Sequence, residues 1–291
     1  KIYAAGRSVD KLKQRFPHFF DSRLLNFVQY DATKNISFDF QVDYIIHAAS
    51  NAHPAAYVAE PVETMLSNVI GTNYLLEYAV NNNLSKFLYI SSSEVYGQKG
   101  NNEPYKEMDY GYVDILNPRA CYPSSKRAAE TLCSSYLNQH GLELVIARPG
   151  HIYGPTMTDS DSRASAQFAR DAINGRDIVM KSAGAQLRSY CYVFDCVSAL
   201  LSILLAGKPG EAYNIGNKDL IVTIRELAEC FAKHGNVKLV FENPDDSEAL
   251  GYNLMSNSAL DTEKLYGLGW NGLYTLDEGV KNTIYLLKYL V

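Results

Sequence analysis

A regular alternation of apolar strand-like runs with helical patterns, in the first half of the chain, constrains the fold more than any other feature. The strand-like runs are Lys1 to Gly6, Asn26 to Tyr30, Val42 to His47, Lys86 to Ile90 and Leu142 to Ala147. Helical patterns begin at Pro61 and at Pro123, and each closes on asparagine or glycine, as helices often do. Strands separated by helices pair in parallel through right-handed crossovers, so we expect an α/β fold with a doubly wound parallel sheet.

The residues that follow the strand-like runs are the first candidates for a site, because ligands of such sheets bind beyond the carboxyl ends of the strands. Asp31 follows one run, a second run leads into "HAAS" at His47 to Ser50, and a third leads into "SSSEVYG" at Ser91 to Gly97. Each of these segments alone is also what an ordinary turn would contain.

The strongest chemical signal is the pair Tyr122 and Lys126, four positions apart at the start of a predicted helix. Side chains at this spacing lie on one helix face. A neighbouring ammonium group favours the phenolate, so we expect a lowered pKa for Tyr122, which would make it a base. A serine hydroxyl at the end of the upstream strand can share the substrate proton. An exposed, chemically idle tyrosine is the alternative for this spacing on its own.

Composition and charge exclude several classes of partner. The net charge of -5 gives no basic surface, so we expect no nucleic-acid partner. No apolar run is long enough to span a bilayer and no signal peptide is visible, so we expect a soluble, cytoplasmic protein without a membrane partner. The five cysteines contain no C-x-x-C pair and are interpreted as reduced packing residues, and the six histidines show no metal-ligand spacing.

Several segments, taken in order, carry a resemblance to one family. They are "VDYIIHAA", "SNVIGTNYLLEYA", "YISSSEVYG", "YPSSKRAAE", "ARPGHIYGP", "RSYCYVFDCVSAL", "EAYNIGN" and "LGWNGLYTLDEGV". With them the chain resembles the extended short-chain dehydrogenase/reductases that modify nucleotide sugars, among them UDP-galactose 4-epimerases, UDP-glucuronate decarboxylases and sugar-nucleotide 4,6-dehydratases. The resemblance implies a Rossmann-like dinucleotide-binding domain over residues 1–155, with a return segment near 186–216, and a smaller α+β substrate lobe over residues 156–291.

One part of the family pattern has no match in this sequence. The family begins with a strand, a G-x-x-G-x-x-G turn and a helix that together hold the dinucleotide pyrophosphate. Here Lys1 to Gly6 resembles the family's second strand, and Gly6 is followed by arginine and serine. We therefore expect an N-terminally truncated sheet with a gap where a central strand would lie.

The resemblance implies NAD or NADP as the cofactor. The residues that it assigns to the cofactor are Arg7, Asp31, Ala48, Ala49, Ser50, Tyr122, Lys126 and Pro149. Asp31 matches the residue near the adenine, and Ala48 and Ala49 match the segment under the pyrophosphate. Arg7 suits the 2′-phosphate of NADP, and a solvated surface arginine is the alternative.

By the same resemblance the reaction is a transient oxidation of a sugar, commonly at carbon 4, before epimerisation, dehydration or decarboxylation. Tyr122 would be the base, Lys126 would lower its pKa and hold the nicotinamide ribose, and Ser92 would bind the reacting hydroxyl. We prefer 4-epimerisation, which needs no further residue. Glu94 as a general acid or base would instead support decarboxylation or dehydration, and a purely structural carboxylate is the alternative.

The residues expected to bind the nucleotide sugar are Ser93, His151, Arg163 and Arg188. Ser93 stands where dTDP-glucose dehydratases have aspartate, which argues against that reaction. His151 stands where the family usually has asparagine, and a core histidine is the alternative. Arg188 matches an arginine aimed at the pyrophosphate. The resemblance also implies a homodimer, built from the helices that begin at Pro61 and Pro123. A non-catalytic sugar-nucleotide binding protein is the second functional class.

Overall fold

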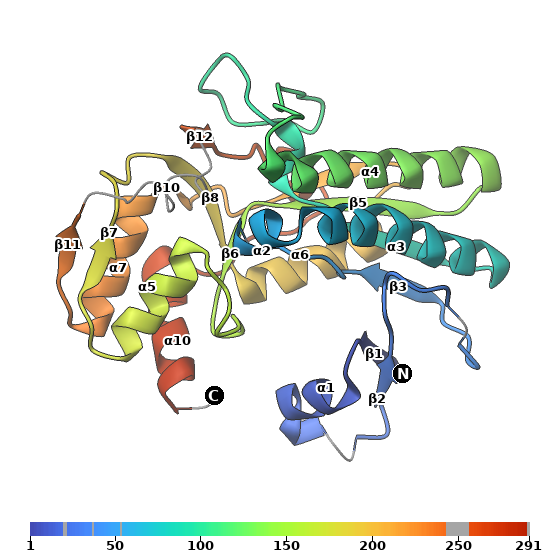
Figure 1. Cartoon of the computed structure of the whole chain (residues 1–291), viewed down its shortest axis with the longest axis horizontal. Helices are drawn as coiled ribbons and strands as arrows, with labels where there is room; N and C mark the ends of the chain where they lie inside the picture. Colours follow the sequence, from blue (N-terminus) through green and yellow to red (C-terminus); the bar gives the residue numbers. More distant parts are fainter. Residues whose placement is uncertain (20–21, 37, 53, 243–255, 290–291) are drawn as a thin grey trace.

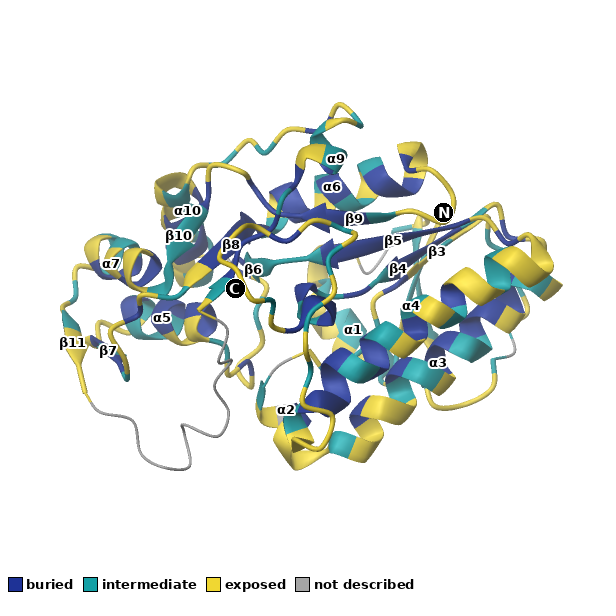
Figure 2. Cartoon of the chain, turned by 90° about the horizontal axis from the view of Figure 1, so that it is seen from above, coloured by how far each residue is buried: buried dark blue, intermediate teal, exposed yellow. Residues whose placement is uncertain are grey.

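Four parallel strands form the main sheet in the computed structural model, which describes residues 1–19, 22–36, 38–52, 54–242 and 256–289. Their order is β3 (Tyr44–His47), β4 (Lys86–Ile90), β5 (Leu144–Pro149) and β9 (Ala212–Ile215). Helices α3 (Pro61–Asn81) and α4 (Cys121–His140) cover one face, and α6 (Val193–Ala206) covers the other (Figures 1 and 2). The predicted doubly wound parallel sheet is therefore present.

The strands are continuous apolar runs because both faces of the sheet are buried. Successive side chains of a strand point to opposite faces. Phe87 and Tyr89 pack in the cluster under α3 and α4, whereas Leu88 between them packs with Ala199 and Ile203 of α6.

Helices α3 and α4 pack side by side and carry the residues of the expected site. A buried hydrogen bond from Asn68 Nδ2 to Ser125 Oγ, 2.9 Å long, fixes one helix against the other. Helix α4 begins at Cys121, two residues before the predicted start at Pro123, because a short 3-10 helix leads directly into it. It ends at Gly141, whose φ of 67° is a left-handed conformation that favours glycine.

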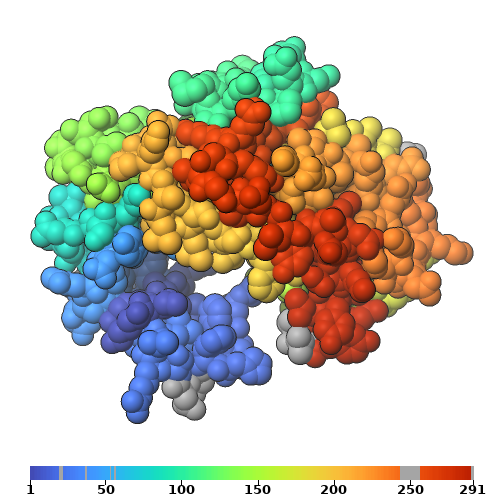
Figure 3. Space-filling view, turned by 180° about the vertical axis from the view of Figure 1, so that it is seen from behind, coloured from blue at the N-terminus to red at the C-terminus, as the bar shows by residue number. Residues whose placement is uncertain are grey.

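The N-terminal residues form a separate unit that has a two-stranded sheet of its own. It consists of β1 (Ile2–Gly6), α1 (Val9–Arg15), the 3-10 helix η1 (Pro17–Phe19) and β2 (Leu25–Gln29), with β1 and β2 parallel. Within the described residues, no strand pairs with the free edge of β1 or with the free edge of β3. The predicted gap in the sheet is thus present. Seen from behind, this region is a blue body below α6, and a notch opens between it and the red C-terminal region (Figure 3).

The second half of the chain builds a smaller lobe of short strands and helices. Its elements are β6 (His151–Tyr153), α5 (Ala164–Ile173), β7 (Ile178–Met180), β8 (Leu187–Tyr192), β10 (Ile221–Thr223), α7 (Ile224–Gly235), β11 (Leu239–Phe241), β12 (Asn257–Ser258) and α10 (Leu276–Tyr289). Helix α9 (Glu263–Tyr266) packs instead on the main sheet, beside β9 and α6. Strand β8 pairs with β6, β10 and β12 here, whereas β9 returns to the main sheet beside β5. The domain boundaries expected from the sequence stay a prediction.

Three further short segments connect these parts near the main sheet. They are α2 (Pro54–Ala59) and the 3-10 helices η2 (Ser93–Tyr96) and η3 (Pro118–Ala120). Among the described helices, none combines the length and the apolar character needed to cross a membrane.

Candidate functional site

Tyr122 and Ser92 meet at the carboxyl end of β4, where a parallel sheet usually holds its ligand. Ser92 caps η2, and its Oγ accepts a hydrogen bond from the backbone N–H of Glu94 at 3.2 Å. Tyr122 lies in the first turn of α4, and the neighbouring Ser92 side chain acts to lower the pKa of its hydroxyl. One turn further along α4, Lys126 Nζ donates to the Ile90 carbonyl at 2.8 Å. The structure thus brings Ser92, Tyr122 and Lys126 together, as expected.

The charge state of this pair differs from the expectation. Burial raises the pKa of Tyr122 to about 12, although hydrogen bonds with Ser92 and Tyr57 act in the opposite direction. Burial also lowers the pKa of Lys126 to about 7. Lys126 Nζ lies 5.8 Å from the centre of the Tyr122 ring and binds a backbone carbonyl instead. The pKa of Tyr122 is thus raised, not lowered, in this structure, because burial outweighs the groups that favour the phenolate. The role of Lys126 toward Tyr122 stays a prediction.

Tyr57 of α2 is a site residue that the sequence did not reveal. Its ring stacks on the ring of Tyr122 with centroids 4.4 Å apart and an interplanar angle of 15°. Its hydrogen bond with Tyr122 lowers the pKa of Tyr122, and the Arg119 guanidinium lies 5.7 Å from the centre of the Tyr57 ring. The pair is buried, so Tyr57 closes one side of the site. An isolated aromatic residue in a short helix has no periodic signal that would have identified it.

Glu94 is held by Arg119, which the sequence did not identify as a site residue either. Arg119 of η3 donates from Nη1 and Nη2 to the two carboxylate oxygens of Glu94, at 3.0 and 2.6 Å. This two-point contact fixes the carboxylate and compensates its charge. Ser93, beside Glu94 in η2, is buried. The Glu94 carboxylate is therefore anchored by the side chain of Arg119.

Arg188 of β8 is a buried cation, with 3% of its surface exposed. Its Nη1 donates to the Leu187 carbonyl at 2.8 Å, and no carboxylate of the described residues forms an ion pair with it. A guanidinium held away from water without a counter-ion is unfavourable unless an anion joins it. Arg188 therefore suits an anionic ligand.

His151 and Arg163 lie in the same electrostatic environment as Arg188. Burial, then the positive charges of Arg188, Arg163 and Arg119, lower the pKa of His151 to about 3, so its imidazole is neutral. Its Nδ1 is buried without a hydrogen-bond partner in the described part of the chain. Arg163 differs from Arg188, because Asp161 accepts hydrogen bonds from its Nε and Nη2. Three arginines and a neutral histidine thus gather around Glu94 and Tyr122.

The residues expected to contact the cofactor lie in two places. Ala48, Ala49 and Ser50 directly follow β3, and Pro149 ends β5, so these residues lie at the carboxyl edge of the main sheet. Asp31 and Arg7 instead follow the strands of the separate N-terminal pair.

Asp31 is held in a local turn. Its carboxylate accepts hydrogen bonds from the backbone N–H and the hydroxyl of Thr33, which lower its pKa. Arg7 is exposed, and its charge contributes to the same shift. The structure therefore leaves Asp31 ionised and able to accept a hydrogen bond, with a cation nearby.

Comparisons with known proteins bear on this geometry. Residues 5–216 match the model of the NAD dependent epimerase/dehydratase family. The chain is 35% identical over 277 residues to UDP-glucuronic acid decarboxylase 5 of Arabidopsis thaliana, covering 94% of this chain and 76% of that protein. It is 29% identical over 279 residues to UDP-glucuronic acid decarboxylase 1 of Xenopus tropicalis, covering 95% of this chain. It spans 63% of the length of that frog protein.

A solved structure agrees with the fold. The UDP-glucuronic acid 4-epimerase of Bacillus cereus, in complex with UDP-glucuronic acid and NAD, superposes with a TM-score of 0.81 at 20% identity, covering 99% of this chain and 91% of that one. Such a likeness concerns the fold alone. The family match, by contrast, covers most of the sequence, including Ser92, Tyr122, Lys126 and Arg188. The chain therefore belongs to the NAD dependent epimerase/dehydratase family.

Proposed function

We propose that this chain is a nucleotide-sugar enzyme that oxidises its substrate transiently at carbon 4, and that the outcome is decarboxylation of a nucleotide-linked uronic acid. The observation that carries the proposal is the buried guanidinium of Arg188, which has no carboxylate partner among the described residues. The diphosphate of a nucleotide sugar brings the negative charge that would pair with this guanidinium. The similarity to two UDP-glucuronic acid decarboxylases supports decarboxylation as the outcome.

This proposal replaces 4-epimerisation, which was the reaction expected from the sequence. Arg188 suits the diphosphate that all nucleotide sugars share, so the choice of decarboxylation rests on the similarity to the two UDP-glucuronic acid decarboxylases. Dehydration at carbons 4 and 6 remains the runner-up that would use Glu94. Ser93, which cannot act as the acid that an aspartate would be in its position, argues against it.

The cofactor that the family implies is NAD, which when bound accepts a hydride from the sugar and later returns it. Tyr122 and Lys126 would hold the nicotinamide ribose, and Ala48, Ala49 and Ser50 would lie along the pyrophosphate. Polar atoms at the same strand ends are buried without partners in the described chain, namely His47 Nδ1 and Ser91 Oγ, which fits a polar ligand there. The exposed Arg7 keeps NADP as an alternative.

The residues of the site divide the work as follows. Ser92 and Tyr122 would receive the proton of the hydroxyl at carbon 4, with Ser92 orienting it. A carbonyl at carbon 4 is β to the carboxylate at carbon 6. The bond between carbons 5 and 6 can then break, its electron pair passing into an enolate as carbon dioxide leaves. Arg188 would hold the diphosphate of the nucleotide during these steps. A proton added at carbon 5 would give the 4-keto pentose, and return of the hydride to carbon 4, with a proton from Tyr122 to its oxygen, would complete the product.

A labelled substrate tests the proposal directly. The chain is incubated with NAD and UDP-glucuronate carrying carbon-13 at carbon 6, and both the released gas and the nucleotide sugars are analysed by mass spectrometry. We expect labelled carbon dioxide and a UDP-pentose. UDP-galacturonate without carbon dioxide would establish epimerisation instead. In a parallel incubation with dTDP-glucose and NAD, loss of water from that sugar would establish dehydration. Binding of NAD and UDP-glucuronate without any product would favour the non-catalytic class.

We also propose that the chain forms a homodimer through α3. Val62, Met65, Leu66 and Ile70 are 61%, 42%, 46% and 37% exposed. Their spacing of three or four residues puts them on one face of the helix, away from the sheet. The α3 helix of a second copy of this chain would cover this apolar face symmetrically.

A further inference from the structure

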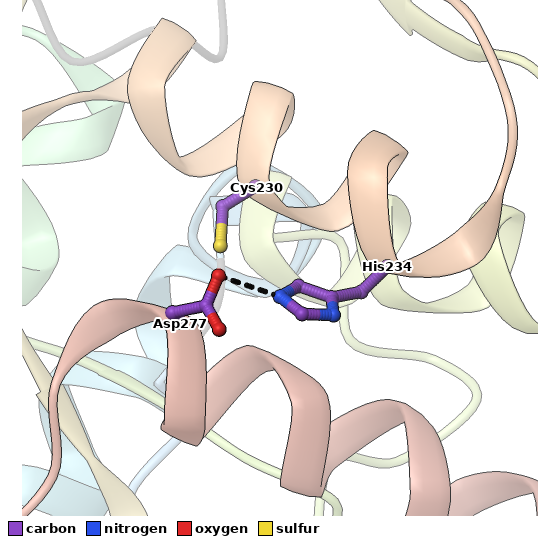
Figure 4. Close-up of side chains that lie close together, drawn as sticks. All are labelled: Cys230, His234 and Asp277. Carbon is purple, nitrogen blue, oxygen red and sulfur yellow. Dashed lines mark hydrogen bonds and ion pairs between the residues drawn. The ribbon is translucent and has the colours of Figure 1, made fainter.

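Cys230, His234 and Asp277 form a cluster in the C-terminal lobe, on elements separate from α4 and η2 (Figures 1 and 4). Cys230 and His234 lie one turn apart on α7, and Asp277 lies in the first turn of α10. The possible ligand atoms, one from each side chain, all lie within 4.8 Å of one another. His234 Nε2 is 2.8 Å from Asp277 Oδ1, and the Cys230 sulfur points toward the same carboxylate (Figure 4).

We propose that Cys230, His234 and Asp277 bind one divalent transition-metal ion of the zinc type. The set combines a thiol, an imidazole and a carboxylate, which are the three ligand classes that zinc uses in proteins. An oxygen-only cation such as Mg²⁺ or Ca²⁺ would not select a sulfur ligand. Three protein ligands leave a fourth tetrahedral position for water.

The scaffold around the cluster is rigid enough to hold the ligands in place. Phe231 and Leu227 of α7 and Val280 and Ile284 of α10 are buried in one core cluster, so the two helices are fixed against each other. Cys230 packs against the Leu276 carbonyl at the start of α10. Only side-chain rotations are then needed to close the site.

Those rotations are small. Zinc bonds of about 2.0–2.3 Å at tetrahedral angles place neighbouring ligand atoms about 3.3–3.7 Å apart. His234 Nε2 and Asp277 Oδ1 are closer than that because they share a hydrogen, which a metal ion would displace. Asp277 is 53% exposed and can move outward, whereas His234 is 17% exposed and stays in place.

Lys233 competes for the same carboxylate. Its Nζ donates to Asp277 Oδ1 at 2.7 Å, but its side chain is 69% exposed. An exposed ion pair contributes little free energy, so a metal ion can displace the ammonium. The competing interpretation is a plain salt-bridge cluster that joins α7 to α10 and binds no metal. Under that interpretation Lys233→Ala would not bind metal more tightly, whereas a metal site predicts tighter binding.

Cobalt is the probe that distinguishes the two. The chain is purified with a chelator, freed of the chelator under reducing conditions and titrated with Co²⁺ while the absorption spectrum is recorded. We expect one cobalt ion per chain, the visible bands of tetrahedral Co²⁺, and an ultraviolet thiolate-to-cobalt charge-transfer band. Zinc should then displace the cobalt and raise the melting temperature.

Single substitutions identify the ligands. Cys230→Ser should abolish the charge-transfer band, and His234→Gln and Asp277→Asn should each weaken binding by at least about tenfold. Lys233→Ala should tighten binding, because it removes the competing cation. Cys121→Ser, His140→Gln and Glu103→Gln are matched controls that change a thiol, an imidazole and a carboxylate elsewhere, and they should leave the titration unchanged.

Two results would overturn the proposal. One is a wild-type chain that shows no charge-transfer band at any cobalt concentration it tolerates. The other is a band that persists in Cys230→Ser or an affinity that is the same in His234→Gln as in the wild type. Asp277 is 53% exposed, so its variant keeps the test valid if Cys230→Ser does not fold. The titration uses no sugar substrate, so its outcome is independent of the proposed decarboxylation.

Discussion

At the scale of single residues, the burial of Tyr122 and Lys126 determines the chemistry that each can perform. A tyrosine whose pKa is about 12 holds its proton at neutral pH, and a lysine whose pKa is about 7 is only partly charged. The hydroxyls of Ser92 and Tyr57 and the positive charge of Arg163 are then the groups that favour the phenolate. A ligand that adds positive charge beside Tyr122 would lower its pKa, and a lower pKa makes the hydroxyl a better base for the reaction.

Replacing Tyr122 with phenylalanine tests its role as the base. We expect Tyr122→Phe to lower turnover by about 10²–10⁴-fold, the range that general bases contribute, because the ring remains and only the hydroxyl is lost. Binding of UDP-glucuronate, measured by calorimetry, should stay within a factor of a few. Tyr110→Phe, at a 64% exposed position, is the control. Unchanged turnover in Tyr122→Phe would rule out this mechanism.

Arg119 provides a prediction about Glu94. Arg119→Lys keeps the positive charge but cannot donate to both oxygens of Glu94, so the carboxylate loses its fixed orientation. We expect the kcat to fall at least about tenfold while KM changes little. Arg176→Lys, which alters an exposed pair with Asp171, should change neither value. A rise in KM alone would instead assign Arg119 to substrate binding.

At the scale of elements, the main sheet and its two long helices could be predicted from the sequence. Strands buried on both faces appear as apolar runs, and α3 begins at Pro61 and ends next to asparagine as its pattern indicates. The ends of two of these elements differ from the sequence pattern. β3 begins at Tyr44, later than the apolar run at Val42, and α4 begins before Pro123. Hydrogen bonding to neighbouring elements decides these limits, and a single sequence does not contain that information.

The site could be predicted only in part, for a related reason. Ser92, Tyr122 and Lys126 meet because strand ends and a helix start have fixed places in a doubly wound sheet. Tyr57 and Arg119 reach the site from α2 and η3, whose positions depend on tertiary packing. The pKa values of Tyr122 and Lys126 follow from burial, which spacing along a helix does not reveal. The cytoplasmic location and the lack of a nucleic-acid partner stay predictions.

The exposed face of α3 leads to a prediction about assembly. Met65→Glu should separate the proposed homodimer into monomers, because it places a charge in the middle of the apolar face. Sedimentation of wild type and variant over a range of concentrations measures this. Leu205→Glu changes an exposed apolar residue of α6 and should leave the dimer intact. Monomeric wild type, or a dimer broken only by Leu205→Glu, would contradict the assignment to α3.

At the scale of the whole molecule, buried histidines link stability to acidity. His47 is 3% exposed and hydrogen-bonded to Thr72 Oγ1 at 3.0 Å, and burial lowers its pKa to about 3 from the ordinary 6.5. Between these two values the unfolded chain binds a proton that the folded chain does not. The stability contributed by neutral His47 is therefore fully present above pH 6.5 and is lost as the pH falls toward 3.

His47→Gln makes this effect measurable. We expect the free energy of unfolding of the wild type to fall between pH 6.5 and 4 with an added slope of about 1.4 kcal/mol per pH unit from His47, and the variant to lack that part. Denaturant titrations at several pH values give the slopes. His140→Gln, at an exposed position, should retain the wild-type slope. Equal slopes in wild type and His47→Gln would show that His47 is not the titrating group.

The separate pairing of β1 and β2 has a consequence for how the molecule opens. Its contacts to the rest are few, such as the stacking of Tyr3 on Phe40 at 3.8 Å, and no backbone ladder of the described residues joins it to β3. Such a unit opens in a cooperative step of its own, with a smaller free energy than global unfolding. In native-state hydrogen exchange, the amides of β1 and β2 should exchange together and much faster than those of β4 and β5. Equal protection of both sheets would mean that the N-terminal pair unfolds only with the whole molecule.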